Sequence, residues 1–112
     1  MKVSQTETLK GFSLGDVIQR PFTGDQMMVV RGEAPKGAIV EKHSHPHEQM
    51  LYVISGSLRF QLEEEEQVLG PGEIVHIPSG KEHSLVFLED SLILDVFSPI
   101  REDMLKKLEQ QQ

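Results

Sequence analysis

Three histidines and one glutamine form the group of side chains best suited to metal chemistry. His43 and His45 are separated by one residue, so an extended strand directs both imidazoles to the same face. Gln49 follows across the turn at Pro46, and His83 comes just after a second proline-containing turn. The chain has no cysteine, so imidazole, amide and carboxylate groups are its available transition-metal ligands. We therefore expect these four side chains to converge on one divalent metal ion, with Ni, Zn, Mn and Fe as candidates.

The role of the remaining polar residues near this group is open. Gln49 has an alternative role as a hydrogen-bonding neighbour of the metal site, which leaves three histidine ligands. His47 follows Pro46 in a turn, so we expect it at the rim of the site or as a partner of a ligand. His76 lies in a predicted strand and faces either the pocket or solvent.

A second candidate group surrounds an acidic residue in an apolar strand. Asp95 interrupts the otherwise apolar segment 92–97, and a carboxylate in such a place is costly unless it is paired or used. Ile93, Asp95 and Phe97 share one face of this strand. Two interpretations remain open. Arg101 forms a structural ion pair with Asp95, or Asp95 transfers a proton while Arg101 binds a substrate carboxylate.

The elements that position these residues are predominantly β-strands. From about Val17 to Phe97, short and often alternating apolar stretches are separated by turn residues, which is typical of an all-β sandwich or barrel. We expect a hairpin that joins Met50–Ser55 to Ser57–Leu62 through Gly56. Further strands are expected at Glu73–Ile77, His83–Leu88 and Ser91–Phe97, and the acidic run 63–66 is expected at a solvated hairpin tip.

A helix is predicted after the last strand. Ser98 is a suitable N-cap, Pro99 suits the first helical position, and Ile100, Met104 and Leu108 fall on one side at helical spacing. We expect this apolar side to pack on the β domain or on a partner subunit.

The bulk composition excludes several classes of protein. The chain has 112 residues, of which 38% are hydrophobic and 26% charged, and this fits one globular domain. A net charge of −7 without a basic stripe argues against a nucleic-acid partner. No signal peptide or apolar stretch of membrane-spanning length is present, so we expect no membrane association and a cytoplasmic location. Exposed edge strands favour a homodimer, with Met27–Val30 as a candidate contact.

Two spaced motifs resemble those of the cupin superfamily. The first contains Gly37, the His43 and His45 pair, Gln49 and Gly56; the second contains Gly72, Pro78, Gly80 and His83. The resemblance implies an all-β fold, a small double-stranded β-barrel of the jelly-roll type with a metal in one mouth. It also implies a single domain over residues 1–112, with a barrel core at about 16–98 and a short C-terminal helix at about 99–109. The chain departs from the family pattern at Gln49, which replaces a glutamate, and at Phe87, which replaces an asparagine.

The segments 43–49 and 95–103 resemble a narrower group, the small cupins of pectin and alginate breakdown. These enzymes open 4,5-unsaturated monouronates to linear keto acids. The resemblance implies a sugar-acid substrate, 5-keto-4-deoxyuronate as product, the metal ligands His43, His45, Gln49 and His83, and an active site lined by Asp95, Phe97 and Arg101. The alternatives are a metal-dependent cupin dioxygenase and a non-catalytic sugar-binding cupin.

Overall fold

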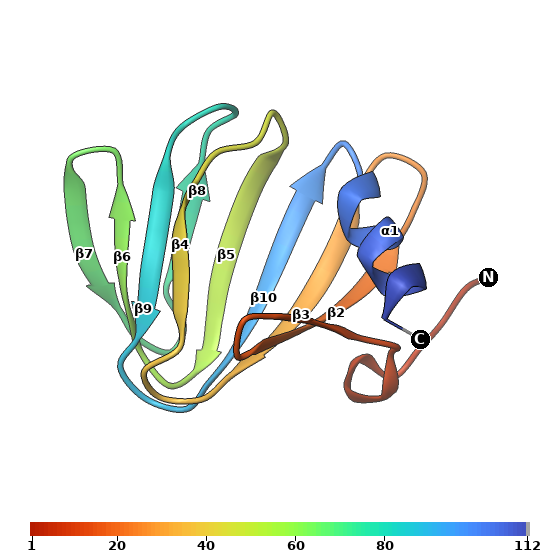
Figure 1. The fold of residues 1–112 in the computed structure, drawn as a ribbon, viewed down its shortest axis with the longest axis horizontal. Helices are drawn as coiled ribbons and strands as arrows, with labels where there is room; N and C mark the ends of the chain where they lie inside the picture. The colour runs from red at the N-terminus through yellow and green to blue at the C-terminus, as the bar shows by residue number, and fades with distance from the viewer. Residues whose placement is uncertain (112) are drawn as a thin grey trace.

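Alternating burial along the chain creates two antiparallel β-sheets in the computed structural model, which describes residues 1–111. One sheet has six strands, in the spatial order β1 (Phe12–Leu14), β2 (Val17–Thr23), β3 (Met28–Ala34), β10 (Ser91–Ser98), β5 (Glu48–Ser55) and β8 (Ile74–Ile77). The other has four, in the order β4 (Ile39–His43), β9 (His83–Phe87), β6 (Leu58–Leu62) and β7 (Glu65–Leu69). A short 3-10 helix, η1 (Thr6–Thr8), precedes the strands, and α1 (Glu102–Gln110) follows them (Figure 1).

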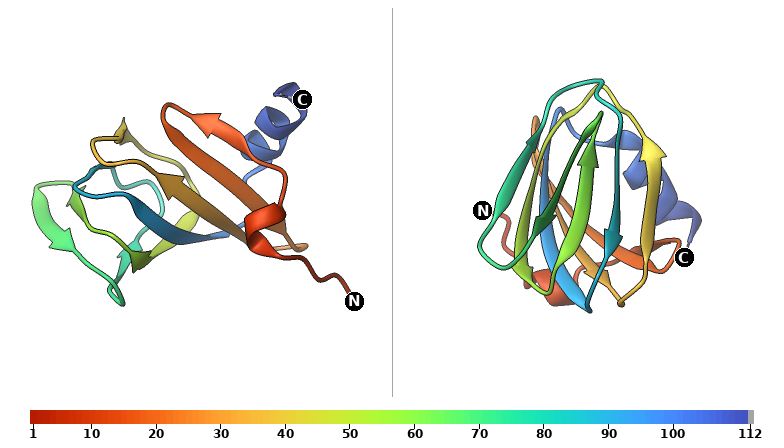
Figure 2. Two further views of the ribbon diagram at one scale, coloured as in Figure 1. Left: turned by 90° about the horizontal axis from the view of Figure 1, so that it is seen from below. Right: turned by 90° about the vertical axis from the view of Figure 1, so that its left-hand side faces the viewer.

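Two apolar clusters cover the inner face of the six-stranded sheet, each over one part of it. One apolar cluster joins it to the four-stranded sheet and includes Leu51 and Val53 from β5 with Phe60 and Phe87 from the opposite sheet. A second cluster joins the β1, β3 and β10 part to the C-terminal helix. Figures 1 and 2 show the four-stranded sheet and α1 at opposite ends of the wide sheet. Residues of the small sheet and of the helix line one cavity in the interior.

The helix confirms the predicted apolar stripe but begins later than expected. Met104 is buried in the second cluster, and Ile100 and Leu108 pack against it. Ser98 does not cap the helix, because it is still extended in β10, opposite Glu48, and its hydroxyl donates a hydrogen bond to a main-chain carbonyl. The helix consequently starts at Glu102, with Arg101 at the N-cap position.

The predicted hairpin through Gly56 is wrong, although both of its strands exist. β5 pairs with β10 and β8, whereas β6 pairs with β7 and β9, so the chain crosses from one sheet to the other at Gly56. Gly56 has φ +86°, and a Cβ there would lie 2.1 Å from the hydroxyl oxygen of Ser91. Only glycine fits this crossover. The hairpin tip predicted at 63–66 is confirmed in part: the turn lies at 63 and 64, and Glu65 and Glu66 already belong to β7.

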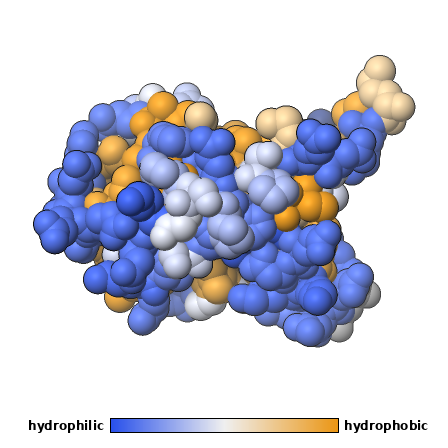
Figure 3. Space-filling model, turned by 90° about the horizontal axis from the view of Figure 1, so that it is seen from above, coloured by the Kyte–Doolittle hydropathy of each residue, from blue (hydrophilic) through white to orange (hydrophobic). Residues whose placement is uncertain are grey.

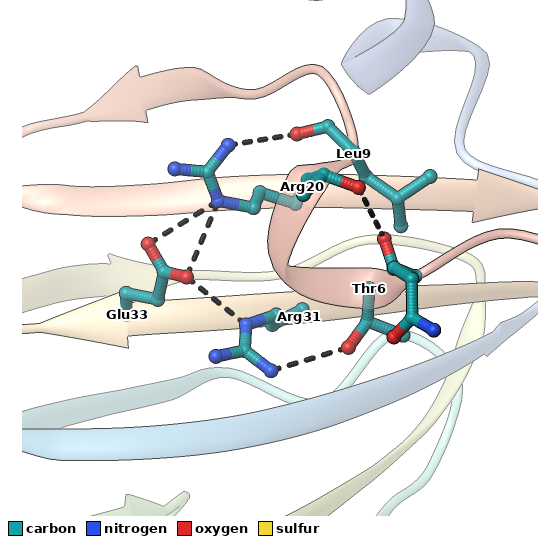
Figure 4. Close-up of polar contacts among 7 residues, drawn as sticks. Thr6, Leu9, Arg20, Arg31 and Glu33 are labelled. Atoms are coloured by element: carbon teal, nitrogen blue, oxygen red, sulfur yellow. Dashed lines mark hydrogen bonds and ion pairs between the residues drawn. The ribbon is translucent and has the colours of Figure 1, made fainter.

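A polar cluster holds η1 against the outer face of the six-stranded sheet (Figure 4). Glu33 accepts hydrogen bonds from Nε of Arg20 and Nε of Arg31, at 3.2 and 3.0 Å. Arg20 also donates to the Leu9 carbonyl, and Arg31 donates to the Thr6 hydroxyl. We call these three charged residues the outer cluster. Each of its charges has a named partner, and the three side chains are partly exposed.

No helix within residues 1–111 has the length and apolar character needed to cross a membrane.

Candidate metal centre

Three histidines from separate segments meet at one end of the fold. His43 is the last residue of β4, His83 is the first residue of β9, and the two lie opposite each other in the pairing of these strands. His45 lies in the loop after β4, not on the strand that the sequence predicted. The candidate ligand atoms of the three imidazoles lie within 4.8 Å of one another. The structure thus brings together all three predicted histidines.

The hydrogen bonds of these imidazoles determine which nitrogen is free. Each Nδ1 lies 2.8 to 3.0 Å from a main-chain carbonyl oxygen, which belongs to Glu41 for His43, to His47 for His45 and to Lys81 for His83. Because a carbonyl can only accept, each Nδ1 carries the proton and each Nε2 carries a lone pair. Nε2 of His83 is buried and has no hydrogen-bond partner among the described residues. Three converging nitrogen lone pairs, one of them unpartnered, fit a divalent metal ion.

Gln49 lies between the histidines and Asp95. Its Oε1 is 3.0 Å from Nε2 of His45, and its Nε2 donates a 2.8 Å hydrogen bond to Oδ1 of Asp95. Since the His45 Nε2 is an acceptor, two acceptors face each other there, an arrangement that a cation stabilises. The sequence placed Gln49 near the metal but did not reveal its bond to Asp95. That bond follows from the sheet register, in which Gln49 is opposite Phe97 and Asp95 is opposite Leu51.

Burial favours the neutral forms of His45 and His83. It lowers the pKa of His45 to about 4, and the nearby Arg101 and His83 side chains act in the same direction. Burial also lowers the pKa of His83. Metal ligation requires neutral imidazole, so both side chains are in the binding form at neutral pH.

Asp95 is a buried carboxyl in the same site. It is 5% exposed, and burial raises its pKa to about 7, although the hydrogen bond from Gln49 and the charge of Arg101 lower it. A carboxyl with a pKa near neutrality can both accept and release a proton at physiological pH.

Arg101 does not form the ion pair with Asp95 that one interpretation required. Its Nε and Nη2 donate to the two carboxylate oxygens of Asp103, at 3.0 and 2.7 Å. Its guanidinium lies 4.9 Å from the centre of the Phe97 ring, and that ring in turn meets His45 edge-on, with centroids 5.7 Å apart. Asp95, Phe97 and Arg101 therefore line one space beside the histidines, as do Asp103 and Lys107 of the helix.

The two remaining histidines differ in their relation to the site. The main-chain carbonyl of His47 accepts the hydrogen bond from Nδ1 of His45, so His47 supports a candidate ligand. His76 is on the outer side, where its Nε2 lies 2.7 Å from a carboxylate oxygen of Glu48 and half of the side chain is exposed. Of the two positions open to His76, the structure gives the solvent-facing one.

Two loops are fastened together where the histidines meet. The Gly80 amide donates a 2.9 Å hydrogen bond to the His45 carbonyl, and the Ser79 hydroxyl donates to the Pro46 carbonyl. Figure 1 shows the β4–β5 and β8–β9 loops side by side at this end, and Figure 3 shows its surface as mainly hydrophilic with separate apolar patches. The loop that carries His45 is thus fixed by the loop that precedes His83.

A cavity of about 470 Å³ extends inward from these residues. This volume is in the range of small-molecule sites. Its wall includes His43, Gln49 and His83 at one end, and the charged side chains of Arg101 and Lys107. The wall also includes many apolar side chains and a buried polar one that the sequence analysis did not single out, Gln19. The sequence contains a signal for it, because Gln19 occupies an inward position of an alternating strand, as Asp95 does.

A two-sheet β fold with a histidine group at its open end defines a class, and comparison with known proteins agrees. The family model described as "Cupin domain" matches residues 30–97, and the chain belongs to this family. It is 38% identical over 96 residues to the pectin degradation protein KdgF of Dickeya dadantii (strain 3937), which covers 82% of this chain and 87% of that protein.

Solved structures agree with this assignment. The structure of KdgF from Halomonas sp. superposes with a TM-score of 0.76 at 35% identity, covering 80% of this chain and 84% of that one. An RmlC-like cupin from Shewanella frigidimarina gives a TM-score of 0.83 at 27% identity, covering 89% and 92%. The mostly-β fold with one short C-terminal helix is therefore confirmed as a cupin fold.

Proposed function

We propose that this protein opens the ring of 4,5-unsaturated uronates, with 5-keto-4-deoxyuronate as the product. The observation that carries the proposal is the convergence of three imidazoles beside a buried carboxyl of raised pKa. Two of them, His43 and His83, line one cavity with Asp95, and His45 is linked to Asp95 through Gln49. The overall similarity to KdgF, a pectin degradation protein, supports a sugar acid as the substrate.

The metal would be held by His43, His45, Gln49 and His83. The unpartnered Nε2 of His83 and the acceptor pair of His45 and Gln49 support this ligand set. A bound divalent ion supplies Lewis-acid stabilisation of the negative charge that develops on oxygen during ring opening. Mixed nitrogen and oxygen donors suit Ni, Zn, Mn or Fe.

The reaction is an isomerisation that needs proton transfers and no external reactant. The anomeric hydroxyl loses its proton, the bond between C1 and the ring oxygen breaks to give an aldehyde, and the resulting enol takes a proton at C4 and becomes a ketone. Asp95 is the group that moves the proton, because it is buried in the cavity and has a pKa near 7. Its hydrogen bond to Gln49 fixes the carboxyl beside the proposed ligands.

Phe97 and Arg101 position the substrate in this proposal. The Phe97 ring offers an apolar surface to the sugar and excludes water from Asp95. Arg101, held by Asp103 and stacked over Phe97, offers its remaining N–H groups to the substrate carboxylate.

The experiment is an assay of purified protein on unsaturated galacturonate. Ring opening removes the conjugated double bond, so the ultraviolet absorbance of the substrate should fall. The initial rate of this fall should be proportional to the concentration of metal-loaded enzyme. Chelation should stop the decay, and adding back one metal equivalent should restore it. Turnover that consumes oxygen and ceases without air would replace this function with a dioxygenase, and binding without any decay would indicate a sugar-binding protein.

We further propose that the protein is a homodimer. The outer face of the six-stranded sheet exposes Tyr52 and Ile74, which are paired neighbours on β5 and β8. Within the segment predicted as a contact, Met27 is exposed, whereas Met28 and Val30 point into the core. Light scattering at micromolar protein should give the mass of two chains, and a monomer mass would refute this proposal.

A further inference from the structure

One polar side chain inside the cavity has no role in the chemistry described so far. Gln19 occupies an inward position of β2, between the buried residues Val17 and Pro21, and only 5% of it is exposed. Its Oε1 is buried and has no hydrogen-bond partner within residues 1–111. Native structures leave few buried polar atoms without a partner, so each such atom calls for a reason.

The surroundings of Gln19 do not supply a partner. Gln19 is paired with Phe12 on one side and with Gly32 on the other. An ideal Cβ at Gly32 would be 3.7 Å from the Gln19 oxygen and 2.8 Å from the Ile93 side chain. The amide therefore lies over β3, directed toward β10, with Ile93 beside it. Phe12, the strand neighbour of Gln19, and Ile93 also line the cavity, and both are apolar.

The sheet register places Gln19 at a useful distance from the acid. Gln19 is opposite Gly32, Gly32 is opposite Ile93, and Asp95 is two residues further along β10. Two strand spacings and two residues put the Cα atoms of Gln19 and Asp95 about 10 Å apart across the sheet and about 7 Å apart along it. The two side chains, which both face the cavity, can reach opposite edges of one monosaccharide ring.

We propose that Gln19 determines substrate specificity by hydrogen-bonding a ring hydroxyl on the edge of the sugar remote from its carboxylate. This inference rests on the proposed function, in which the carboxylate lies at the Arg101 end. A hydroxyl both donates and accepts, and an amide offers the matching acceptor and donor. No charge is needed at this edge, and none of the residues paired with Gln19 carries one.

The test compares Gln19→Met with Gln67→Met in the metal-loaded protein. Methionine keeps the length of the side chain and removes its hydrogen bonds, and Gln67 is an exposed residue of β7 outside the cavity. Gln19→Met should raise KM for unsaturated galacturonate roughly 5- to 100-fold, because a buried substrate hydroxyl then lacks its partner. It should change kcat by less than a few-fold and leave metal content equal to wild type. Gln67→Met should change none of these quantities.

Thermal unfolding separates this role from a structural one. Replacing an unpartnered buried amide by an apolar group should leave the Tm of Gln19→Met equal to or above that of wild type. A normal KM in the folded variant would overturn the inference, since Oε1 would then need no ligand partner. A large fall in Tm would also overturn it, because the amide would be supporting the fold.

Direct binding keeps the inference separate from the proposed reaction. Calorimetric titration of galacturonate into wild type and Gln19→Met should show 5- to 100-fold weaker binding by the variant. If wild type binds galacturonate more tightly than the variant but does not convert the unsaturated sugar, the proposed reaction fails and the role of Gln19 stands. If wild type converts the unsaturated sugar and the variant matches it, the role of Gln19 fails alone. A wild type that neither binds nor converts overturns both.

Discussion

Polar side chains lie on both sides of the six-stranded sheet, in the outer cluster and in the interior, and the two sets differ in one respect. In the outer cluster, Glu33 receives hydrogen bonds from Arg20 and Arg31, and each arginine has a further acceptor in the segment around η1. In the interior, Oε1 of Gln19 on this sheet and Nε2 of His83 on the facing four-stranded sheet are buried and have no partner in the described chain. A partnered cluster fastens elements together, whereas an unpartnered one is suited to a ligand.

Removing an imidazole from the candidate metal centre should have the largest effect. His83→Ala is expected to lose most of the metal and all metal-dependent turnover, because it deletes one of three convergent nitrogens. His76→Ala, on the outer side of β8, is the matched control and should keep both. Elemental analysis and the uronate assay measure the two quantities. Metal occupancy in His83→Ala equal to that of wild type would defeat the ligand assignment.

Changing the buried acid should separate metal binding from rate. Asp95→Asn keeps an acceptor for the Gln49 amide, so metal content and fold should persist while kcat falls roughly 10²- to 10⁴-fold. Asp25→Asn, at an exposed position, should behave as wild type. Near-normal turnover by Asp95→Asn would sink the proposed proton transfer.

Arg101, which lines the cavity, and Arg31 of the outer cluster give a direct comparison. Arg101→Lys keeps the charge but loses the planar fork, so KM should rise by about tenfold, more than kcat falls. Arg31→Lys, in the outer cluster, should leave KM unchanged and lower the free energy of unfolding by about 1 kcal/mol or less. Steady-state kinetics and thermal unfolding of both variants check this pair. Equal effects of the two substitutions on KM would contradict the proposed role of Arg101 in binding the substrate.

The smallest effect concerns pH and the metal-free protein. The pKa of Asp95 is raised from 3.8 to about 7, so its contribution to stability is full below about 4 and is lost as pH rises through 7. Asn carries no charge at any of these pH values. Relative to wild type, chelated Asp95→Asn should therefore have a higher Tm by several degrees at pH 8, and this advantage should shrink as pH falls toward 4. A constant difference across that range would show that Asp95 is not a buried titrating group.

The sequence predicted the candidate ligands better than their supports. Their spacing, together with the resemblance to the cupin motifs, predicted that His43, His45 and His83 meet. Strand parity does not explain this, because His45 lies in the loop after β4 and His43 meets His83 through the pairing of β4 with β9. Asp95 was recognisable because a charge in an apolar strand needs a partner or a use. Its hydrogen bond to Gln49 depends on which strands are neighbours, and alternation along a strand does not encode that.

The predictions that were wrong or incomplete also failed because local sequence patterns do not show which strands are neighbours. The hairpin at Gly56 was predicted because alternation defines which face of a strand is buried, but it does not define the sheet to which the strand belongs. Of the two interpretations left open for Arg101, the ion pair with Asp95 is not formed, because Arg101 at the start of α1 is paired with Asp103 of the first turn. Gln19 was missed since a single polar residue in an edge-proximal strand looks unremarkable until the register places it over Gly32.

The fastening of the two loops bears on how a metal would enter. The hydrogen bonds from Gly80 and Ser79 to the carbonyls of His45 and Pro46 hold together segments more than thirty residues apart in the chain. The conformational entropy of gathering the histidines is therefore lost when the protein folds, not when the ion arrives. Such a site is rigid before it is loaded, so it discriminates among ions by how well each accepts a fixed spacing of donors. A flexible site would adjust its donor spacing to each ion, whereas this site should bind best the ion whose radius and geometry match the existing spacing.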